Sequence, residues 1–202
     1  MDTAVSLVQS YLFANGFFTV TEYPILETLT PGDSRTVTDI DVLALRFPGA
    51  GDSNRGATTS GIMIEPDSEL GLSDDYIEVI IAEVKEGAAE LNKAARDPAV
   101  LRAVLDRFGA MDPDIAQQVV DELVRTGTAM HPSGLVRFRQ MVFASLPPTR
   151  YHYRYTWISH GHIVEWMREQ VREHWDKIKT IQSKNPVLSY MILFEKALRG
   201  ET

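Results

Sequence analysis

The chain has 202 residues, of which 44% are hydrophobic, and it contains no cysteine. This length and this hydrophobic content suffice for one domain with a buried core. The lack of cysteine excludes a disulfide framework, a thiolate metal site and a cysteine nucleophile, and it fits the cytoplasm, where we expect the protein to work. No apolar run approaches the ~18 residues that a membrane-spanning helix needs, so we expect no membrane partner.

The net charge of −8 at first argues against a nucleic-acid partner, because phosphate binding normally needs a basic surface. The charge is unevenly distributed. Residues 1–130 hold 9 basic and 22 acidic side chains, a balance of −13, whereas residues 131–202 hold 11 and 6, a balance of +5. A site built from carboxylates would produce such an acidic average, although solubility explains it equally well.

One helix and two strands are predicted at the start of the chain. Apolar residues at helical spacing predict a helix over 2–14. Aromatic and β-branched residues predict a strand over 17–27, with a late break or bulge near Pro24. The sequence TPGDSRT (30–36) is typical of a turn, and alternating residues predict a second strand over 36–47.

A long loop and a central strand follow. Residues 48–75 are rich in Gly, Ser, Asp and Pro, which predicts a long loop with one short strand at 61–65. Residues 76–87 (YIEVIIAEVKEG) have the high apolar content of a strand at the centre of a sheet.

The second half of the chain predicts helices and two further strands. Asp112-Pro113 supplies a helix N-cap followed by proline at the first helical position. The predicted elements are helices over 88–109 and 113–126, strands within 131–147 and over 150–159, and helices over 160–182 and 186–199. Consecutive strands that pair as a meander, followed by a helical crossover to a further strand, make an α/β fold.

Two acids and a lysine stand out on the second and third predicted strands. Glu83 and Lys85 are two residues apart and therefore share a face, and Asp41 lies close to Glu83 if the two strands are neighbours. Two adjacent carboxylates repel each other unless a cation lies between them, and Mg²⁺, with Mn²⁺ as a substitute, needs only one or two carboxylates. An ammonium group beside such a cation can orient or help deprotonate an attacking water. Together these groups indicate phosphodiester hydrolysis.

The segments TDIDVLAL (38–45) and IIAEVKEG (80–87), after an opening helix and a strand with Glu22, resemble the PD-(D/E)XK nuclease superfamily, which has the restriction-endonuclease-like fold. The resemblance implies a core of order αβββαβ over about residues 1–160, with a mixed central sheet flanked by helices. The chain would then be one nuclease-like domain, with helices over 160–202 at its C-terminal end.

The same resemblance implies a Mg²⁺-dependent nuclease whose partner is nucleic acid, with DNA as the first expectation. It implies metal ligation by Asp41, Glu83, the backbone carbonyl of Val84 and Glu22, and a water positioned by Lys85. Three departures from the family are visible: Ile40 replaces the name-giving proline, the loop lengthens the gap between the acids, and the chain is acidic. Paired cuts would need two active sites, which leaves a homodimer open.

Other interpretations stay open at this stage. The same fold could lack catalysis and serve as a nucleic-acid or protein binding module, or Glu83 and Lys85 could form a plain ion pair in an unrelated α/β domain. Asp39 and Asn92 could support the metal ligands, although exposed positions suit both. Glu22 is equally compatible with an edge-strand charge.

Several further residues have structural interpretations that outweigh functional ones. His160 and His162 lack a third zinc ligand, which favours capping or surface roles. The period-two stripe of Tyr151, Tyr153, Tyr155 and Trp157 is typical of a core, with base stacking as the minor alternative. On the helix over 160–182, the apolar residues Met167, Val171, Trp175 and Ile178 indicate a core or a dimer seam. Its basic residues Arg168, Arg172, Lys177 and Lys179 alternate with acids, which favours paired surface charge over a DNA groove.

Overall fold

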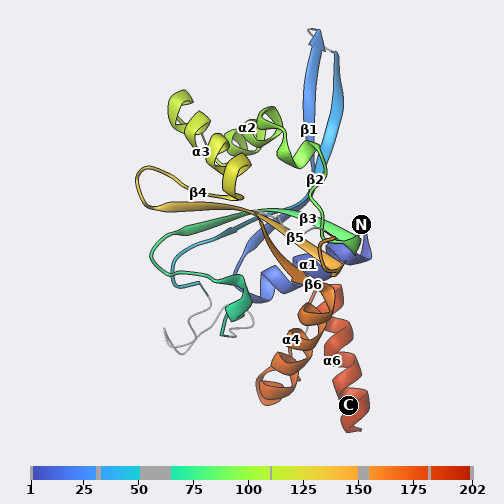
Figure 1. Ribbon diagram of the computed structural model, residues 1–202. Coiled ribbons are helices and arrows are strands. Elements are labelled where there is room, and N and C mark those ends of the chain that lie inside the picture. Colours follow the sequence, from blue (N-terminus) through green and yellow to red (C-terminus); the bar gives the residue numbers. More distant parts are fainter. Residues whose placement is uncertain are drawn as a thin grey trace.

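The computed structural model describes residues 2–30, 33–50, 65–109, 111–149, 155–181 and 183–200, without the side chains of residues 28–30. Figure 1 shows a sheet with helices on both of its faces. The elements in chain order are α1 (Thr3–Ala14), β1 (Phe18–Thr30), β2 (Asp33–Arg46), the 3₁₀ helix η1 (Ser68–Leu70), β3 (Ile77–Ala88), the 3₁₀ helix η2 (Ala94–Arg96), α2 (Pro98–Arg107), α3 (Pro113–Thr126), β4 (Thr128–Met130), β5 (Val136–Leu146), β6 (Thr156–Ser159), α4 (His160–Glu173), α5 (Trp175–Ile178) and α6 (Pro186–Arg199).

The strands form one mixed sheet in the order β1-β2-β3-β5-β4, in which β6 also pairs with β5. β1, β2 and β3 pair in antiparallel fashion, whereas β5 runs parallel to both β3 and β6. β3 therefore lies between an antiparallel and a parallel neighbour near the centre of the sheet. The expected α/β class, with consecutive strands in a meander and a helical crossover from β3 to β5, is confirmed.

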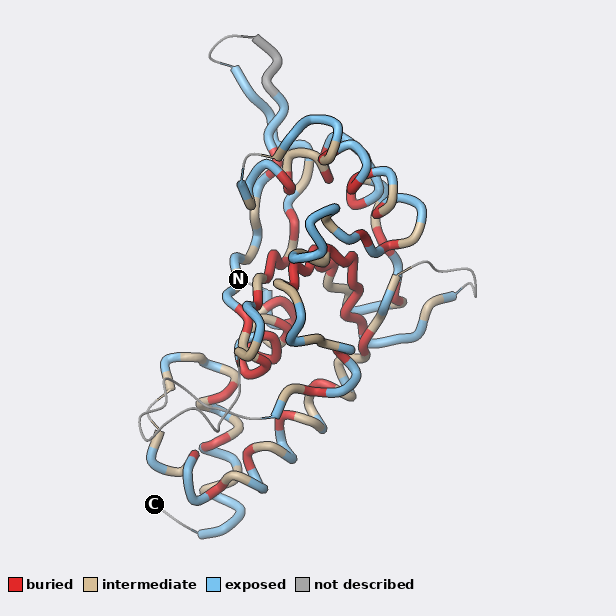
Figure 2. The backbone as a smooth tube through the Cα atoms, turned by 90° about the vertical axis from the view of Figure 1, so that its left-hand side faces the viewer, coloured by how far each residue is buried: buried red, intermediate tan, exposed pale blue. Residues whose placement is uncertain are grey.

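The two faces of the sheet are covered by different helices (Figure 1). Ile80 and Ala82 of β3 pack with α1 and α4, whereas Val79 and Ile81 pack with α2 and α3. This alternation follows from the two-residue period of a strand, and it explains why both parities of β3 are apolar. Figure 2 shows the buried residues concentrated along the central strands and the helix beside them.

Local capping chemistry starts three of the long helices where the sequence predicts them. Asp2 accepts a hydrogen bond from the Ala4 amide at the start of α1, and Asp112 does the same for α3 with Pro113 at the first helical position. Asn185 begins α6 in the same way. At the end of α3, Gly127 adopts φ 75, a left-handed conformation that a glycine reaches without strain.

Other predicted elements need correction. The helix expected over 88–109 is a 3₁₀ turn followed by α2, which begins at Pro98 because Asp97 caps it. The helix expected over 160–182 ends at Glu173 and continues as the short α5. The sequence analysis missed β4 and η1. The turn expected over 30–36 is shorter than predicted, because β1 extends to Thr30 and β2 begins at Asp33.

Two of these expectations lie partly outside the described residues. Of the short strand expected at 61–65, only Glu65 is described, and it is not in a strand. Of the strand expected over 150–159, the described part contains β6. Within the described residues, no helix has the length and apolar character needed to cross a membrane.

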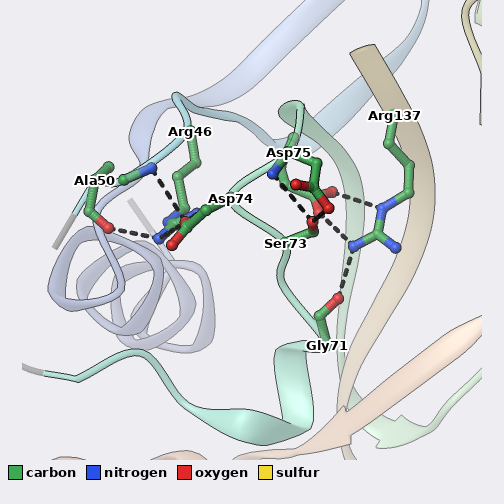
Figure 3. A network of polar contacts seen from close by, with 9 residues as sticks. Arg46, Ala50, Gly71, Ser73, Asp74, Asp75 and Arg137 are labelled. Carbon is green, nitrogen blue, oxygen red and sulfur yellow. Dashed lines mark hydrogen bonds and ion pairs between the residues drawn. The ribbon is translucent and has the colours of Figure 1, made fainter. Parts of the chain in front are cut away.

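A polar cluster ties the segment after the long loop to one end of the sheet (Figure 3). Arg46 donates to Asp74 at 3.1 Å and to the Ala50 carbonyl at 2.5 Å, while Arg137 donates to the Gly71 carbonyl at 2.6 Å. Arg137 also forms an ion pair with Glu78, which is fully buried. Buried charges are tolerated when they are paired in this way, so the cluster fixes residues 70–75 against β2, β3 and β5.

Candidate functional site

The hairpin of β1 and β2 bends at Glu22 and Asp41. Thr21 pairs with Val42 and Tyr23 pairs with Ile40, so this register places Glu22 opposite Asp41. Glu22 has φ 53, which is unusual for a residue with a side chain. Val42 packs in the core beneath α1, whereas Ile40 packs in the core beneath α2 and α3. The hairpin therefore changes the face that it presents to the core at this residue pair.

The bend brings the Asp41 carboxylate to β3. The last regular pair between β2 and β3 is Val42 with Ala82, and continuing this register by one residue places Asp41 opposite Glu83. Beyond that pair, Asp41 Oδ2 accepts a hydrogen bond of 2.7 Å from the Val84 amide. The carboxylate thus satisfies a backbone donor at the point where the two strands separate.

Glu83 is buried and is held by two neighbours. Lys85 forms an ion pair with Glu83 Oε1, and the same oxygen accepts a hydrogen bond of 2.9 Å from Asn92 Nδ2. Asn92 is itself held by its Oδ1, which accepts from the Ala95 amide at 2.6 Å. Asn92 therefore contacts Glu83 as the sequence analysis considered, but from the segment before η2 and not from a helix.

Burial raises the pKa of both carboxyl groups. For Asp41, desolvation is the largest cause, and the hydrogen bond from Val84 and the charge of Lys85 oppose it. For Glu83, desolvation again dominates and the charge of Asp41 adds to it, while Lys85 and Asn92 act in the opposite direction. The charge of Asp41 therefore acts on Glu83 in a poorly solvated place, which is a frequent property of functional carboxylates.

The donor atoms at this place suit a hard divalent cation. Among the described residues, Asp41 Oδ1 and Glu83 Oε2 take part in no hydrogen bond or ion pair, so each carboxylate has one oxygen available. No group of three or more His, Asp or Glu side chains with metal-site geometry occurs in the described part of the chain. Two carboxylates with retained waters are nonetheless a sufficient set for Mg²⁺, and a cation between them would offset their mutual repulsion.

The other predicted ligands are less closely engaged. Glu22 faces Asp41 in register, but its side chain is exposed and makes no hydrogen bond or ion pair with the described residues. Asp39 is exposed and acts on Asp41 through its charge. The Val84 amide contacts Asp41, but no contact assigns a role to its carbonyl.

The sequence analysis missed Asp2. Its charge contributes to raising the pKa of Asp41, so the start of α1 lies within electrostatic reach of the site. The only signal in the sequence is its position as the N-cap of the first helix, which gives no hint of a distant strand.

The two histidines are partly buried and contact other elements, which differs from the capping or surface roles that the sequence favoured. His160 contacts Ser145 Oγ at 3.1 Å and His162 contacts Asp67 at 2.6 Å, so they do not share a site. Tyr155 and Trp157 pack against a small core cluster, whereas Tyr151 and Tyr153 lie outside the described residues.

The helical segment after His160 also follows its structural interpretation. The apolar residues of the expected stripe are buried within the chain, which supports the core interpretation; they are Met167, Val171, Trp175 and Ile178. Two of the basic residues pair with acids, Arg172 with Glu195 at 3.3 Å and Lys179 with Asp176 at 2.9 Å. Arg168 and Arg172 alternate along α4 with exposed acids, and Lys177 is exposed on α5.

Comparison with protein-family models, with curated proteins and with solved structures finds no match to this chain. The function is therefore argued from the site itself.

Proposed function

We propose that this protein is a metal-dependent nuclease that hydrolyses phosphodiester bonds of nucleic acid, with DNA as the first substrate to test. The main observation behind the proposal is that Asp41 of β2 lies beside Glu83 and Lys85 of β3. Two partly or fully buried carboxylates beside one ammonium group match the needs of metal-assisted phosphoryl transfer.

Asp41 and Glu83 would hold Mg²⁺ through the two oxygens that have no other partner. The bound ion would supply positive charge to the phosphate and lower the pKa of a coordinated water. Lys85 lies against Glu83, where its ammonium group can orient that water and offset the negative charge that grows on the phosphate. Asn92 fixes the Glu83 carboxylate, while Glu22 would extend the ligand set only after its side chain turned toward Asp41.

The element order supports a restriction-endonuclease-like core as part of this proposal. A first helix, an antiparallel run of β1, β2 and β3, a helical crossover and a parallel β5 follow one another. The acids lie where the regular pairing of β2 with β3 ends, at Val42 and Ala82.

One observation favours a second candidate, a nuclease-like fold that binds a nucleic acid or a protein without cutting. Asp41 accepts a hydrogen bond from the Val84 amide and Glu83 forms an ion pair with Lys85, so all three side chains already have structural partners. A protein of this second kind would keep these contacts and would bind no divalent cation at the pair.

Cleavage of plasmid and of single-stranded circular DNA with Mg²⁺ or Mn²⁺ tests the first proposal. We expect Lys85→Ala to slow cleavage by about 10²-fold or more, because a positioned proton-transfer group contributes about 10²–10⁴-fold. Lys177→Ala, which removes an exposed lysine on α5, is the matched control and should cut as the unchanged protein does. Cleavage that persists at full rate in Lys85→Ala would refute the assignment.

A further inference from the structure

A groove lies between the first turns of α1, the start of α4 and one side of α6. It has a volume of about 770 Å³, and most of its wall is apolar, with Leu7, Val164, Val187 and Met191 among the lining residues. It is on the face of the sheet that α1 and α4 cover. Concave, mainly apolar sites of this kind are typical of places that hold a small molecule or part of a larger one.

Besides Thr3 of α1, three polar side chains line this apolar groove, each from a different element. Glu86 comes from β3, Ser145 from the end of β5 and His160 from the first position of α4. Ser145 Oγ and His160 Nδ1 are 3.1 Å apart, and the other ring nitrogen of His160 is buried without a hydrogen-bond partner among the described residues. Burial lowers the pKa of His160 against the opposing charges of Glu86 and Asp2, so the ring is neutral at neutral pH.

Two aromatic rings form the outer wall of the groove. Tyr190 and Phe194, one turn apart on α6, stack with centroids 6.3 Å apart and an interplanar angle of 27°. They are 61% and 63% exposed, which is unusual for large aromatic side chains with no partner to cover them. Flat, exposed rings of this kind are the surfaces on which unpaired bases stack.

The groove and the proposed active site are on opposite faces of β3, next to each other along the strand. Glu86 directly follows Lys85 and, because strand neighbours point to opposite faces, it enters the groove while Lys85 stays with Glu83. Asp2 acts electrostatically on both Asp41 and His160, so the start of α1 is within electrostatic reach of both places. A single strand that passes around the end of β3, which ends at Ala88, would contact both places.

We propose, on the basis of the proposed nuclease function, that the groove holds one unpaired nucleobase that carries an exocyclic amino group, so that the substrate class is single-stranded or locally opened nucleic acid. The base would stack against Tyr190 and Phe194, and its amino group would donate to the Glu86 carboxylate and to Ser145. A base satisfies both the apolar walls and the polar side chains, whereas an acyl chain would leave Glu86 desolvated without a donor. The sugar and phosphates remain on the solvent side, away from the acidic groups.

Fluorescence anisotropy with labelled oligo-dC, oligo-dT and duplex DNA tests this proposal in the full chain carrying Lys85→Ala, without metal. We expect oligo-dC to bind more tightly than oligo-dT and duplex. Adding Tyr190→Ala or Phe194→Ala should weaken oligo-dC binding by about tenfold or more. Glu86→Gln should remove the preference for dC over dT, because the amide can donate to thymine as well as accept from cytosine.

Leu198→Ala is the matched control, since Leu198 is 71% exposed on the same helix but does not line the groove. Equal oligo-dC affinities in the Leu198→Ala, Tyr190→Ala and Phe194→Ala proteins would overturn the proposal. So would sedimentation with neutral phosphatidylcholine vesicles that Tyr190→Ala abolishes, because this result would assign the groove to lipid.

The two proposals fail in different ways. Binding of oligo-dC that depends on Tyr190, in a protein that cuts no DNA, would leave the groove standing and remove the nuclease. Cleavage that depends on Lys85 but not on Tyr190, with equal affinity for single strands and duplex, would do the reverse.

Discussion

Divalent cations should stabilise this protein through the carboxylate pair. We take a dissociation constant of about 1 mM for Mn²⁺, the weak end of the range for carboxylate sites, because only two side-chain ligands are available. At about 10 mM Mn²⁺, binding to the folded state alone then adds about 1.4 kcal/mol to the free energy of unfolding. For a chain of this length, the midpoint of thermal unfolding should rise by about 3–6 °C.

The assay is thermal unfolding followed by circular dichroism, with and without Mn²⁺. The increase should disappear in Asp41→Asn and in Glu83→Gln, because each variant loses the charge of one ligand. Glu165→Gln is the control, since it removes an exposed acid on α4, and it should keep the full increase. An equal increase in Asp41→Asn and in the unchanged protein would refute the reasoning, because the ion would then bind elsewhere.

The pH dependence gives an independent check on the same pair. Because burial raises the folded-state pKa of Asp41 and Glu83 above the unfolded values of about 4, the metal-free protein loses stability as pH rises through the folded values. Protons also compete with the cation, so the Mn²⁺ effect should be smaller at about pH 5 than at neutral pH. Glu83→Gln should reduce the loss of metal-free stability as pH rises from about 4, the unfolded value, to neutral pH.

Two further predictions concern stability away from the ligands. Glu78→Ala should lower the free energy of unfolding by about 3–5 kcal/mol, because it leaves the buried charge of Arg139 and the partly buried charge of Arg137 uncompensated. Glu122→Ala at an exposed pair should change it by less than about 1 kcal/mol. Urea titration measures both, and equal losses would contradict the role of the cluster. Glu22→Gly should raise the free energy of unfolding by up to about 1 kcal/mol, since glycine tolerates the positive φ at this position. A loss of stability would show that the bend is not strained. An accompanying loss of cleavage would identify Glu22 as a ligand.

Local chemistry explains which elements could be predicted from the sequence. The helices that begin at Pro113 and Pro186 are capped by the preceding residues, Asp112 and Asn185. Their observed bounds match the predicted ones. β3 was recognisable because both of its faces are apolar, as a central strand requires. The shared face of Glu83 and Lys85 follows from the strand period alone.

Tertiary contacts determine the elements that could not be predicted from the sequence. Residues 89–93 resemble a helix, but Ala89 and Leu91 pack against β5 and Asn92 turns to Glu83, so α2 begins only at Pro98. β4 has three residues and exists because it pairs with β5. The charge effect of Asp2 on Asp41 links the start of α1 to the middle of β2, and no local pattern encodes it.

The bend of the hairpin also determines how the two carboxylates are placed relative to each other. β1 and β2 continue well beyond the bend as an arm whose residues 33–37 are all exposed (Figure 1). Glu83 is fixed in the rigid centre of the sheet, whereas Asp41 lies at the pivot of this arm. A change in the angle of the arm at this bend would therefore change the spacing of the two carboxylates of the proposed metal site.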